Sequence, residues 1–277
     1  MGRATFENGV AIVTGGASGI GRALGEELAR RGARVHLADV QAERAASVAD
    51  GIRRSGGWAE AAELDVTDEA AVRSRVERVV RTCGRLDYMF NNAGIAVVGE
   101  FRDQSLADVH RLLDVNLRGV VNGSHAAYAV MVAQGSGHIV NTASMAGLVP
   151  TPSFASYCAS KHGVVGLSLA LRAEGAALGV KVSAICPGFV HTSILENGQL
   201  VNVRSEVVRD AGNAGRLGQS PESCARAILR GVARNQPIVI TPRPWRLIWR
   251  LGRLFPALWN PLGRRIMARF RRDFRAA

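Results

Sequence analysis

Residues 14–21 read TGGASGIG and join the apolar run Val10–Thr14 to a segment of helical period that ends before Gly32. A short β-branched run next to glycines predicts a buried strand. The loop glycines permit a tight turn, close approach of the backbone to a pyrophosphate and close packing of the next helix. The phosphates would lie at the positive N-terminus of that helix. This order of strand, loop and helix predicts a dinucleotide site, with simple turn formation as the alternative.

Strands and helices alternate along the rest of the chain. Further strands are predicted at 34–38, 60–64, 86–91, 137–142, 180–185 and 238–241. Helices are predicted at 41–55, 68–83 (with Thr67 as N-cap), 105–130, 154–178 and 221–234. Repeated βαβ units predict the α/β class, as one doubly wound Rossmann-type parallel sheet with helices on both faces. Residues 1–242 are expected to form a single domain.

The formal net charge of +12 is unevenly distributed over the 277 residues. Residues 243–277 hold ten arginines and one acid, which leaves 25 basic and 22 acidic side chains in the rest of the chain. We expect a nearly neutral body and a basic, amphipathic C-terminal extension. The four cysteines and six histidines lack metal-ligand spacing. They predict no disulfide scaffold and no metal site, and they fit a reducing cytoplasm.

Asp39 ends the second predicted strand, 18 residues after Gly21. A carboxylate there accepts hydrogen bonds from an adenosine ribose and repels a 2′-phosphate, which favours NAD over NADP. The alternative is an aspartate that caps the helix beginning at Gln41. Arg22 and Arg34 are near enough in sequence to soften the preference.

Tyr157 and Lys161 are four residues apart on a predicted helix, so their side chains share one face. A free tyrosine has a pKa near 10, and a neighbouring ammonium or a nicotinamide cation favours the phenolate. The pair therefore predicts a general base with a lowered pKa. A Tyr/Lys pair on an exposed helix surface is the alternative. Lysine is informative at this position because the chain has only two.

Ser144 and Asn116 complete a candidate catalytic set. Ser144 follows the strand at 137–142, on the carboxyl side where open α/β sheets bind ligands, and its hydroxyl would hold a substrate oxygen. Asn116 lies within a predicted helix, where asparagine is a poor helix former. A turn serine and a core amide are the respective alternatives.

The motifs together resemble the short-chain dehydrogenase/reductase family in its common NAD(P)-dependent form, over residues 10 to about 240. The resemblance implies hydride transfer between nicotinamide and a secondary alcohol or ketone, with Tyr157 exchanging the hydroxyl proton. It further implies that Asn116 joins a water-mediated proton relay through Lys161. The residues that carry it are Thr14–Gly21, Asp65-Val66, Asn91–Gly94, Asn116, Ser144, Tyr157–Lys161 and Pro187-Gly188.

The same resemblance implies the cofactor contacts and the assembly. A homo-tetramer or homo-dimer would form on the two long helices. The expected cofactor-binding residues are Gly15, Ser18, Gly19, Ile20, Gly21, Asp39, Asp65, Val66, Asn91, Ala93, Gly94, Tyr157, Lys161, Pro187, Gly188, Val190 and Thr192.

Substrate selection is expected from the segment 194–218, whose glycines at 198, 212, 215 and 218 make it a candidate lid. An apolar wall would come from Val97, Val98, Leu148, Val149 and Phe154, which favours a small lipophilic alcohol or ketone such as a steroid, a retinoid-like molecule or a fatty alcohol. No obvious anion clamp stands out, although Arg204, Arg209 and Arg216 could supply one.

The extension 243–277 holds three of the four tryptophans among its arginines. Basic, aromatic-rich amphipathic segments lie in membrane interfaces, and a peripheral membrane contact is one interpretation. The other is an arm that packs on the body or on a neighbouring subunit. Nucleic acid is not expected, because no recognised binding fold accompanies the charge. For the whole protein, a cofactor-binding scaffold with little turnover is the alternative to an enzyme.

Overall fold

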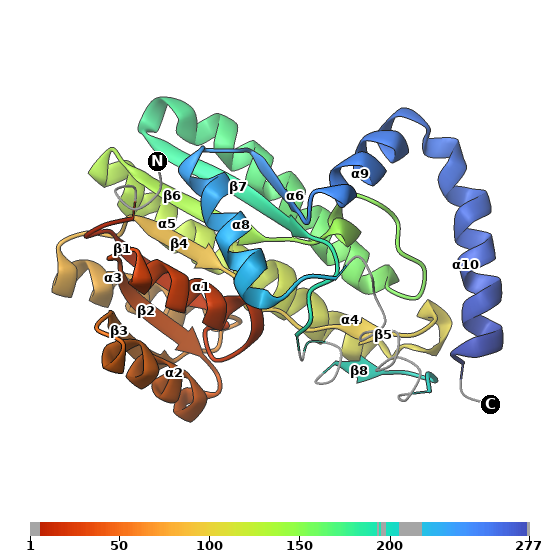
Figure 1. Cartoon of the computed structure of the whole chain (residues 1–277), viewed down its shortest axis with the longest axis horizontal. Helices are drawn as coiled ribbons and strands as arrows, with labels where there is room; N and C mark the ends of the chain where they lie inside the picture. Colours follow the sequence, from red (N-terminus) through yellow and green to blue (C-terminus); the bar gives the residue numbers. More distant parts are fainter. Residues whose placement is uncertain (1–5, 193, 195–197, 205–217, 276–277) are drawn as a thin grey trace.

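The computed structural model describes residues 6–192, 194, 198–204 and 218–275 (Figure 1). Its seven-stranded parallel sheet has the order β3-β2-β1-β4-β6-β7-β9, and a short β5 pairs separately with β8. The strands are β1 (Val10–Thr14), β2 (Arg34–Asp39), β3 (Trp58–Glu63), β4 (Tyr88–Asn91), β5 (Val97–Val98), β6 (Gly137–Thr142), β7 (Val180–Pro187), β8 (Gln199–Leu200) and β9 (Ile238–Thr241).

Helices cover both faces of this sheet, as predicted (Figure 1). One face carries α1 (Gly19–Arg30), α2 (Ala42–Arg54) and α8 (Pro221–Ala233). The other carries α3 (Glu69–Cys83), α5 (Gly119–Gln134) and α6 (Ala155–Gly175), with α4 (Leu106–Leu113) before α5. The predicted doubly wound Rossmann-type fold is therefore confirmed.

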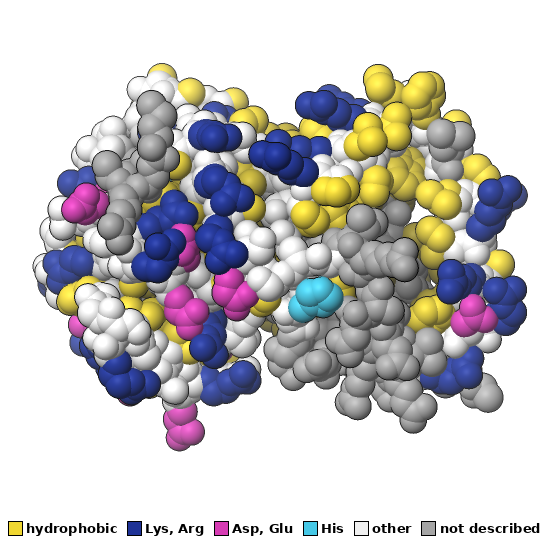
Figure 2. Space-filling view, viewed as in Figure 1, with side chains coloured by type: hydrophobic (Ala, Val, Ile, Leu, Met, Phe, Trp, Pro, Cys, Tyr) yellow, Lys and Arg dark blue, Asp and Glu magenta, His cyan; other side chains and the backbone are white. Residues whose placement is uncertain are grey.

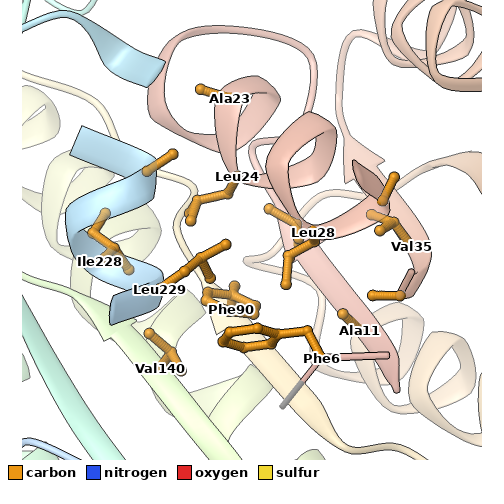
Figure 3. Packing of buried hydrophobic residues seen from close by; sticks show 14 of the residues in the cluster. Phe6, Ala11, Ala23, Leu24, Leu28, Val35, Phe90, Val140, Ile228 and Leu229 are labelled. Carbon is orange, nitrogen blue, oxygen red and sulfur yellow. The ribbon is translucent and has the colours of Figure 1, made fainter. Parts of the chain in front are cut away.

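Strand β1 shows why the sheet needs two helical layers. Successive side chains of a strand point to opposite faces. Ala11 and Val13 pack in the cluster under α1 and α8, whereas Val10 and Ile12 pack in the cluster under α3 and α5. Figure 3 shows the first cluster, where Leu24 and Leu28 of α1 meet Ile228 and Leu229 of α8 over the sheet. A strand buried on both faces is mostly apolar, and β1 is buried at every position and apolar from Val10 to Val13.

The strand order also locates the ligand site. The chain winds outward in opposite directions on the two sides of β1, so the topological switch point lies between β1 and β4. In open α/β sheets, ligands bind at the carboxyl ends of the strands at such a point. The loop at 14–21 and the end of β4 both lie there.

Two local predictions differ from the structure, and a third concerns residues that the structure mostly does not describe. The N-cap of α3 is Asp68, whose carboxylate accepts the Ala71 N–H at 3.0 Å, and not Thr67. Thr67 instead donates its hydroxyl to Asp65 at 2.8 Å, so the better cap lies one residue later. The predicted helix 105–130 contains a π-helical turn at Asp114–Arg118 between α4 and α5. Most of the candidate lid at 194–218 lies outside the described residues.

The basic extension forms α9 (Pro244–Leu254) and α10 (Trp259–Asp273). Trp245, Trp249 and Trp259 pack against the apolar cluster under α6 that includes Met145 and Val149. The far end of α10 is fixed by ion pairs from Arg271 and Arg275 to the buried carboxylate of Glu100, each at 2.8 Å. Residues 243–275 are called the tail below. The two-part division at residue 242 stays a prediction.

Candidate active site

The glycine-rich loop between β1 and α1 depends on the absence of side chains. Gly15 and Gly19 have φ of +66° and +52°, a region that other residues rarely adopt. A Cβ on Gly21 would lie 2.0 Å from the carbonyl oxygen of Gly15, so the first turn of α1 packs directly on the loop backbone. Ser18 precedes α1 in extended conformation, and its side chain makes no cap hydrogen bond to the helix. The arrangement leaves the start of α1 available to an anion.

Replacing Gly21 by alanine is expected to weaken cofactor binding about tenfold or more, because the added methyl group forces the loop backbone away from α1. Titration of the protein with NADH, followed by cofactor fluorescence, measures this loss. Gly51→Ala in α2 is the matched control, since its Cβ would meet nothing closer than 3.9 Å. Equal NADH affinity in the two variants would contradict the loop assignment.

Asp39, at the end of β2, holds the loop in place. Its carboxylate accepts the Ala17 N–H at 3.0 Å and the Gln41 N–H at 2.9 Å. It therefore turns toward the glycine-rich loop and also binds the backbone just before α2. Its contact with an adenosine ribose and its selection of NAD stay predictions. Arg34 lies at the opposite end of β2, where its guanidinium stacks 4.5 Å from the Trp58 ring centroid. The expectation that Arg34 is near the adenosine end was wrong.

A cleft of about 330 Å³ opens at the N-terminus of α1. The described residues that line it do not include Ser144 or Tyr157. The cleft therefore borders the side of the glycine-rich loop that does not face these two residues. Arg44, which the sequence analysis did not single out, contributes a second cation beside Arg22. The lining residues are Ala17, Ser18, Gly19, Arg22, Ala23, Glu26, Arg44, His191, Thr192, Pro221 and Glu222.

Thr14 and Asn92, which were absent from the predicted cofactor contacts, join the strand ends at the switch point. The Thr14 hydroxyl oxygen accepts the N–H groups of Asn92 and Ala93 at 2.9 and 3.1 Å. The Asn92 amide donates to the Thr14 carbonyl at 3.1 Å and accepts the Thr142 hydroxyl at 3.3 Å. The ends of β1, β4 and β6 are thereby tied together. Both residues stood within the motifs that carried the family resemblance, which was the available signal.

Asn91 is buried in the sheet, where its amide donates to Ser124 at 3.1 Å and to Asn141 at 2.8 Å. These bonds tie β4 to α5 and β6. Asn91 therefore stabilises the sheet. A direct cofactor contact of Asn91 stays a prediction.

Ser144, Tyr157 and Lys161 come together beyond the carboxyl end of β6. Ser144 begins a short 3₁₀ turn, its oxygen accepts the Ala146 N–H at 3.1 Å, and its side chain hydrogen-bonds with Tyr157. The Lys161 ammonium lies 5.6 Å from the Tyr157 ring centroid and donates to the Thr142 carbonyl at 2.9 Å. The one-turn spacing of Tyr157 and Lys161 on α6 places both toward this end of the sheet. An exposed surface pair is excluded, since Lys161 is 2% exposed.

The pKa of Tyr157 departs from the sequence expectation. Burial raises it to about 12, although the hydrogen bond from Ser144 lowers it. Burial also lowers the pKa of Lys161 to about 8. Residue spacing does not reveal how strongly the site removes water from both groups, and in the protein alone this desolvation is the largest influence on the pKa of Tyr157.

Asn116 lies in the π-helical turn, fully buried, and its amide pairs with the backbone of Ile95. Its oxygen accepts the Ile95 N–H at 2.8 Å and its nitrogen donates to the Ile95 carbonyl at 2.9 Å. A Cβ on Gly94 would lie 3.1 Å from the Asn116 oxygen and 3.5 Å from the Lys161 nitrogen. Gly94 therefore lets the chain pass between Asn116 and Lys161. Single π turns in α-helices are frequent at functional sites.

The strand end after β7 meets the tail. A Cβ on Gly188 would lie 2.2 Å from the Trp245 Nε1, so this glycine admits the tail's indole ring. The Gly188 N–H donates to the Thr241 carbonyl at 2.8 Å. Val190 forms an isolated bridge with Gln219. Sequence reasoning missed the contribution of Trp245, and its only signal was the clustering of tryptophans after residue 242.

The sequence profile of the short chain dehydrogenase family matches residues 9–206, most of the chain. The chain belongs to the short-chain dehydrogenase/reductase family. It is 34% identical to the putative oxidoreductase SadH of Mycobacterium tuberculosis over 269 residues, which cover 96% of this chain and 98% of SadH. Because the match covers 96% of this chain, it extends into the tail. The family accounts for the order of the motifs along the chain.

Two further relatives bear on the chemistry of this dehydrogenase. It is 36% identical to the cyclohexanol dehydrogenase of an Acinetobacter species, over 80% of this chain and 87% of that enzyme. The crystal structure of a family member from Burkholderia phymatum in complex with NAD matches with a TM-score of 0.83 and 31% identity, over 91% of this chain and 95% of the other. The chain is therefore an NAD(P)-dependent oxidoreductase that acts on CH–OH groups.

The other predicted positions are distributed around this site. Asp65 accepts the Thr67 N–H at 2.8 Å, while the Val66 carbonyl accepts the Asn122 amide at 2.9 Å and so fixes the end of β3 against α5. Thr192 packs beside Gly19. In the described part of the chain, no group of three or more His, Cys, Asp or Glu is placed to hold a metal ion.

Of the three candidates for an anion clamp, the structure describes Arg204 alone. Arg204 donates to the carbonyls of Arg272 and Asp273 in the tail, at 3.3 and 2.6 Å. Arg209 and Arg216 lie outside the described residues. Phe154, a residue of the predicted apolar wall, meets Tyr157 with the two ring centroids 6.1 Å apart in an edge-on arrangement.

Proposed function

We propose that this dehydrogenase transfers hydride between NAD and a lipophilic secondary alcohol or ketone, with Tyr157 as the general acid/base. The observation that carries the proposal is the hydrogen-bonded Ser144–Tyr157 pair beside the buried ammonium of Lys161. A tyrosine placed in this way can accept the alcohol proton in oxidation and return it in reduction. The bound nicotinamide supplies the hydride acceptor or donor.

The chain's own residues have separate roles in this proposal. Ser144 orients the substrate oxygen with the same hydroxyl that hydrogen-bonds with Tyr157 in the protein alone. Lys161, which is fixed by the Thr142 carbonyl, stabilises the phenolate and hydrogen-bonds a ribose hydroxyl. Asn116 continues a water-mediated proton path behind Lys161. Burial raises the pKa of Tyr157 to about 12. The positive charges of Lys161 and of the nicotinamide are therefore both needed to stabilise its phenolate.

The residues at the strand ends fit a dinucleotide. The glycine-rich loop leaves the start of α1 free of a side-chain cap, and the carboxylate at the end of β2 faces that loop. Proposed contacts at the adenosine and pyrophosphate end are Gly15, Ser18, Gly19, Ile20, Gly21, Asp39, Asp65 and Val66. Proposed contacts toward the nicotinamide are Asn91, Ala93, Gly94, Tyr157, Lys161, Pro187, Gly188, Val190 and Thr192.

Replacing Asp39 by asparagine is expected to change the cofactor preference. The variant loses the negative charge that repels a 2′-phosphate, while Arg22 and Arg44 remain in the adjoining cleft. The ratio of kcat/KM for NAD to kcat/KM for NADP should fall about tenfold or more. Steady-state kinetics with both cofactors measures the ratio.

The matched control for this change is Asp68→Asn, which also removes a carboxylate that accepts a backbone N–H. Its cofactor ratio should equal that of the wild type. An Asp39→Asn variant with an unchanged ratio would show that Asp39 does not select NAD.

The lipophilic substrate is supported by the apolar surroundings of Tyr157 and by the relatives. The Phe154 ring borders Tyr157, and Met145 and Val149 follow Ser144 into an apolar cluster. A relative with 36% identity is named for the oxidation of cyclohexanol, which is an apolar secondary alcohol. We infer a substrate of that chemical class, without a charged group near the carbinol.

A panel of secondary alcohols, run with NAD and with NADP, tests the proposed activity. Lipophilic alcohols should yield NADH, and alcohols carrying a carboxylate or phosphate should be poorer substrates. The competing function is a scaffold that binds the cofactor, and it predicts NADH binding without turnover of any alcohol. Detection of binding alone would therefore favour the scaffold.

Assembly and location are part of the proposal. We infer a homo-dimer or homo-tetramer built on α5 and α6, the two long helices, whose exposed surfaces include Val121 at 41% and Leu169 at 39%. The four cysteines are present as free thiols, which suits the cytoplasm.

A further inference from the structure

The tail exposes apolar side chains next to arginines that have no acidic partner among the residues described by the structure. Half of the large hydrophobic side chains found exposed in the described residues fall within 247–266. Figure 2 shows hydrophobic side chains gathered over α9 and the start of α10, with basic side chains beside them. The tail patch consists of Leu247, Leu251, Leu254, Phe255, Leu262 and Ile266 with Arg243, Arg246, Arg250, Arg253, Arg264 and Arg265.

Helical spacing divides α9 into three stripes. Trp245 and Trp249, four residues apart, pack on the body. Leu247, Leu251 and Leu254 follow each other by four and three residues and are 62%, 48% and 71% exposed. Arginines at 246, 250 and 253 repeat the same spacing, so they form a parallel exposed stripe. The body therefore covers only the tryptophan face and leaves the leucine and arginine faces in solvent.

The two helices present these side chains as one surface. The Trp259 indole N–H donates to the Gly252 carbonyl at 3.2 Å, and a Cβ on Gly252 would lie 2.1 Å from the Trp259 ring. This contact closes α10 back on α9. At the other end, Phe270 is buried against Val203 and Arg271 is paired with Glu100. The tail is thus held at both ends while its outer side stays uncovered by the described residues.

No described acidic side chain neutralises the charge of the patch. The tail arginines that form ion pairs in the described structure are those at 269, 271, 272 and 275. The six arginines of the patch have no carboxylate within ion-pair distance among the described residues, and residues 243–266 contain no acid. A partner that matches this surface must offer negative charge beside an apolar layer.

We infer that the tail patch docks on the surface of an anionic lipid bilayer. The leucines and Phe255 enter the acyl boundary while the arginines contact the headgroups, the arrangement of interfacial amphipathic helices. A second copy fits less well, because a two-fold contact through the same patch would bring two sets of six arginines together. Nucleic acid would leave the leucine stripe in water. Among the described residues, no helix is long and apolar enough to cross a membrane.

Flotation of the full chain with vesicles tests this inference. Wild-type protein should float with vesicles of equal parts phosphatidylcholine and phosphatidylglycerol, and raising the salt concentration should reduce the bound fraction. Leu247→Ser/Leu254→Ser should lower the partition coefficient about tenfold or more. Val40→Ser/Leu178→Ser is the matched control, since these side chains are 60% and 44% exposed elsewhere on the surface, and it should float like the wild type.

Two further measurements separate the other occupants of the patch. Arg250→Gln/Arg264→Gln/Arg265→Gln should lose the preference for phosphatidylglycerol over pure phosphatidylcholine vesicles. Light scattering should give the same mass for wild type and for Leu247→Ser/Leu254→Ser, and both should bind NADH alike. Failure of the wild type to float with anionic vesicles, or a smaller mass for the leucine variant, would overturn the inference, the latter by showing that a second copy covers the patch. Neither outcome depends on the proposed alcohol substrate.

Discussion

Replacing Tyr157 by phenylalanine is expected to lower kcat for alcohol oxidation by about a thousandfold, within the range that general acid–base catalysis contributes. The change removes one oxygen atom, the one that hydrogen-bonds with Ser144, and leaves the ring that meets Phe154. Affinity for NADH and the thermal unfolding midpoint should remain close to those of the wild type. Steady-state oxidation of a lipophilic secondary alcohol measures the effect.

Tyr128→Phe is the matched control for this variant. Tyr128 lies on α5 at the edge of the cluster under α3, away from Ser144 and Lys161, so its hydroxyl should not affect turnover. Comparable activity of the Tyr157→Phe variant and the control would refute the assignment of Tyr157 as general acid/base.

Replacing Lys161 by methionine is expected to have the second-largest effect, a loss of kcat/KM of about a hundredfold. The variant loses the ammonium that stabilises the Tyr157 phenolate and the hydrogen bond to the Thr142 carbonyl. Because burial lowers the pKa of Lys161 to about 8, the site keeps this ammonium near its point of deprotonation. Lys181→Met, which changes the other lysine at an exposed position of β7, should retain full activity.

The same lysine predicts how stability depends on pH. Its pKa falls from 10.5 in the unfolded chain to about 8 in the folded protein. Between these values the unfolded state binds more protons, so this residue's contribution to the free energy of unfolding rises with pH. The free energy of unfolding of Lys161→Met minus that of the wild type should therefore be about 2 kcal/mol smaller at pH 10 than at pH 7. Urea unfolding at both pH values measures it, and a constant difference would show that Lys161 is not buried as an ammonium.

The parallel sheet could be predicted because its signals are local. A strand buried on both faces is mostly apolar, as β1 is from Val10 to Val13, and the glycines at 15, 19 and 21 mark a turn that only small residues permit. The spacing of Tyr157 and Lys161 fixes a shared helix face without tertiary information. These features depend on neighbours in sequence, so the sequence contains them in full.

Features that depend on distant neighbours could not be predicted. The pKa of Tyr157 follows from how much chain covers it, which spacing does not reveal. The π-helical turn at Asn116 is linked to pairing with Ile95, 21 residues earlier in the chain. The contact between Gly188 and Trp245 joins two parts of the chain that the sequence analysis treated separately. Arg34 was misplaced because nearness in sequence along a strand does not mean nearness at one end of the sheet.

The tail contacts the body of the protein on one side and solvent on the other. Its tryptophans pack behind the segment that follows Ser144, and Trp245 lies on Gly188 at the end of β7. Its leucines and unpaired arginines face outward from the same helix. Most of the net charge of +12 therefore belongs to a surface feature and says little about the reaction.

Transfer of deuterium from a labelled alcohol tests the central claim most directly. Lipophilic secondary alcohols deuterated at the carbinol carbon are incubated with the wild-type protein and NAD, and the cofactor is analysed by mass spectrometry and NMR. The proposed activity predicts that deuterium arrives at C4 of the nicotinamide, and that Tyr157→Phe reduces its rate of arrival about a thousandfold. Tight binding of NADH together with no deuterium transfer from any alcohol of the panel would contradict the assignment as a lipophilic alcohol dehydrogenase.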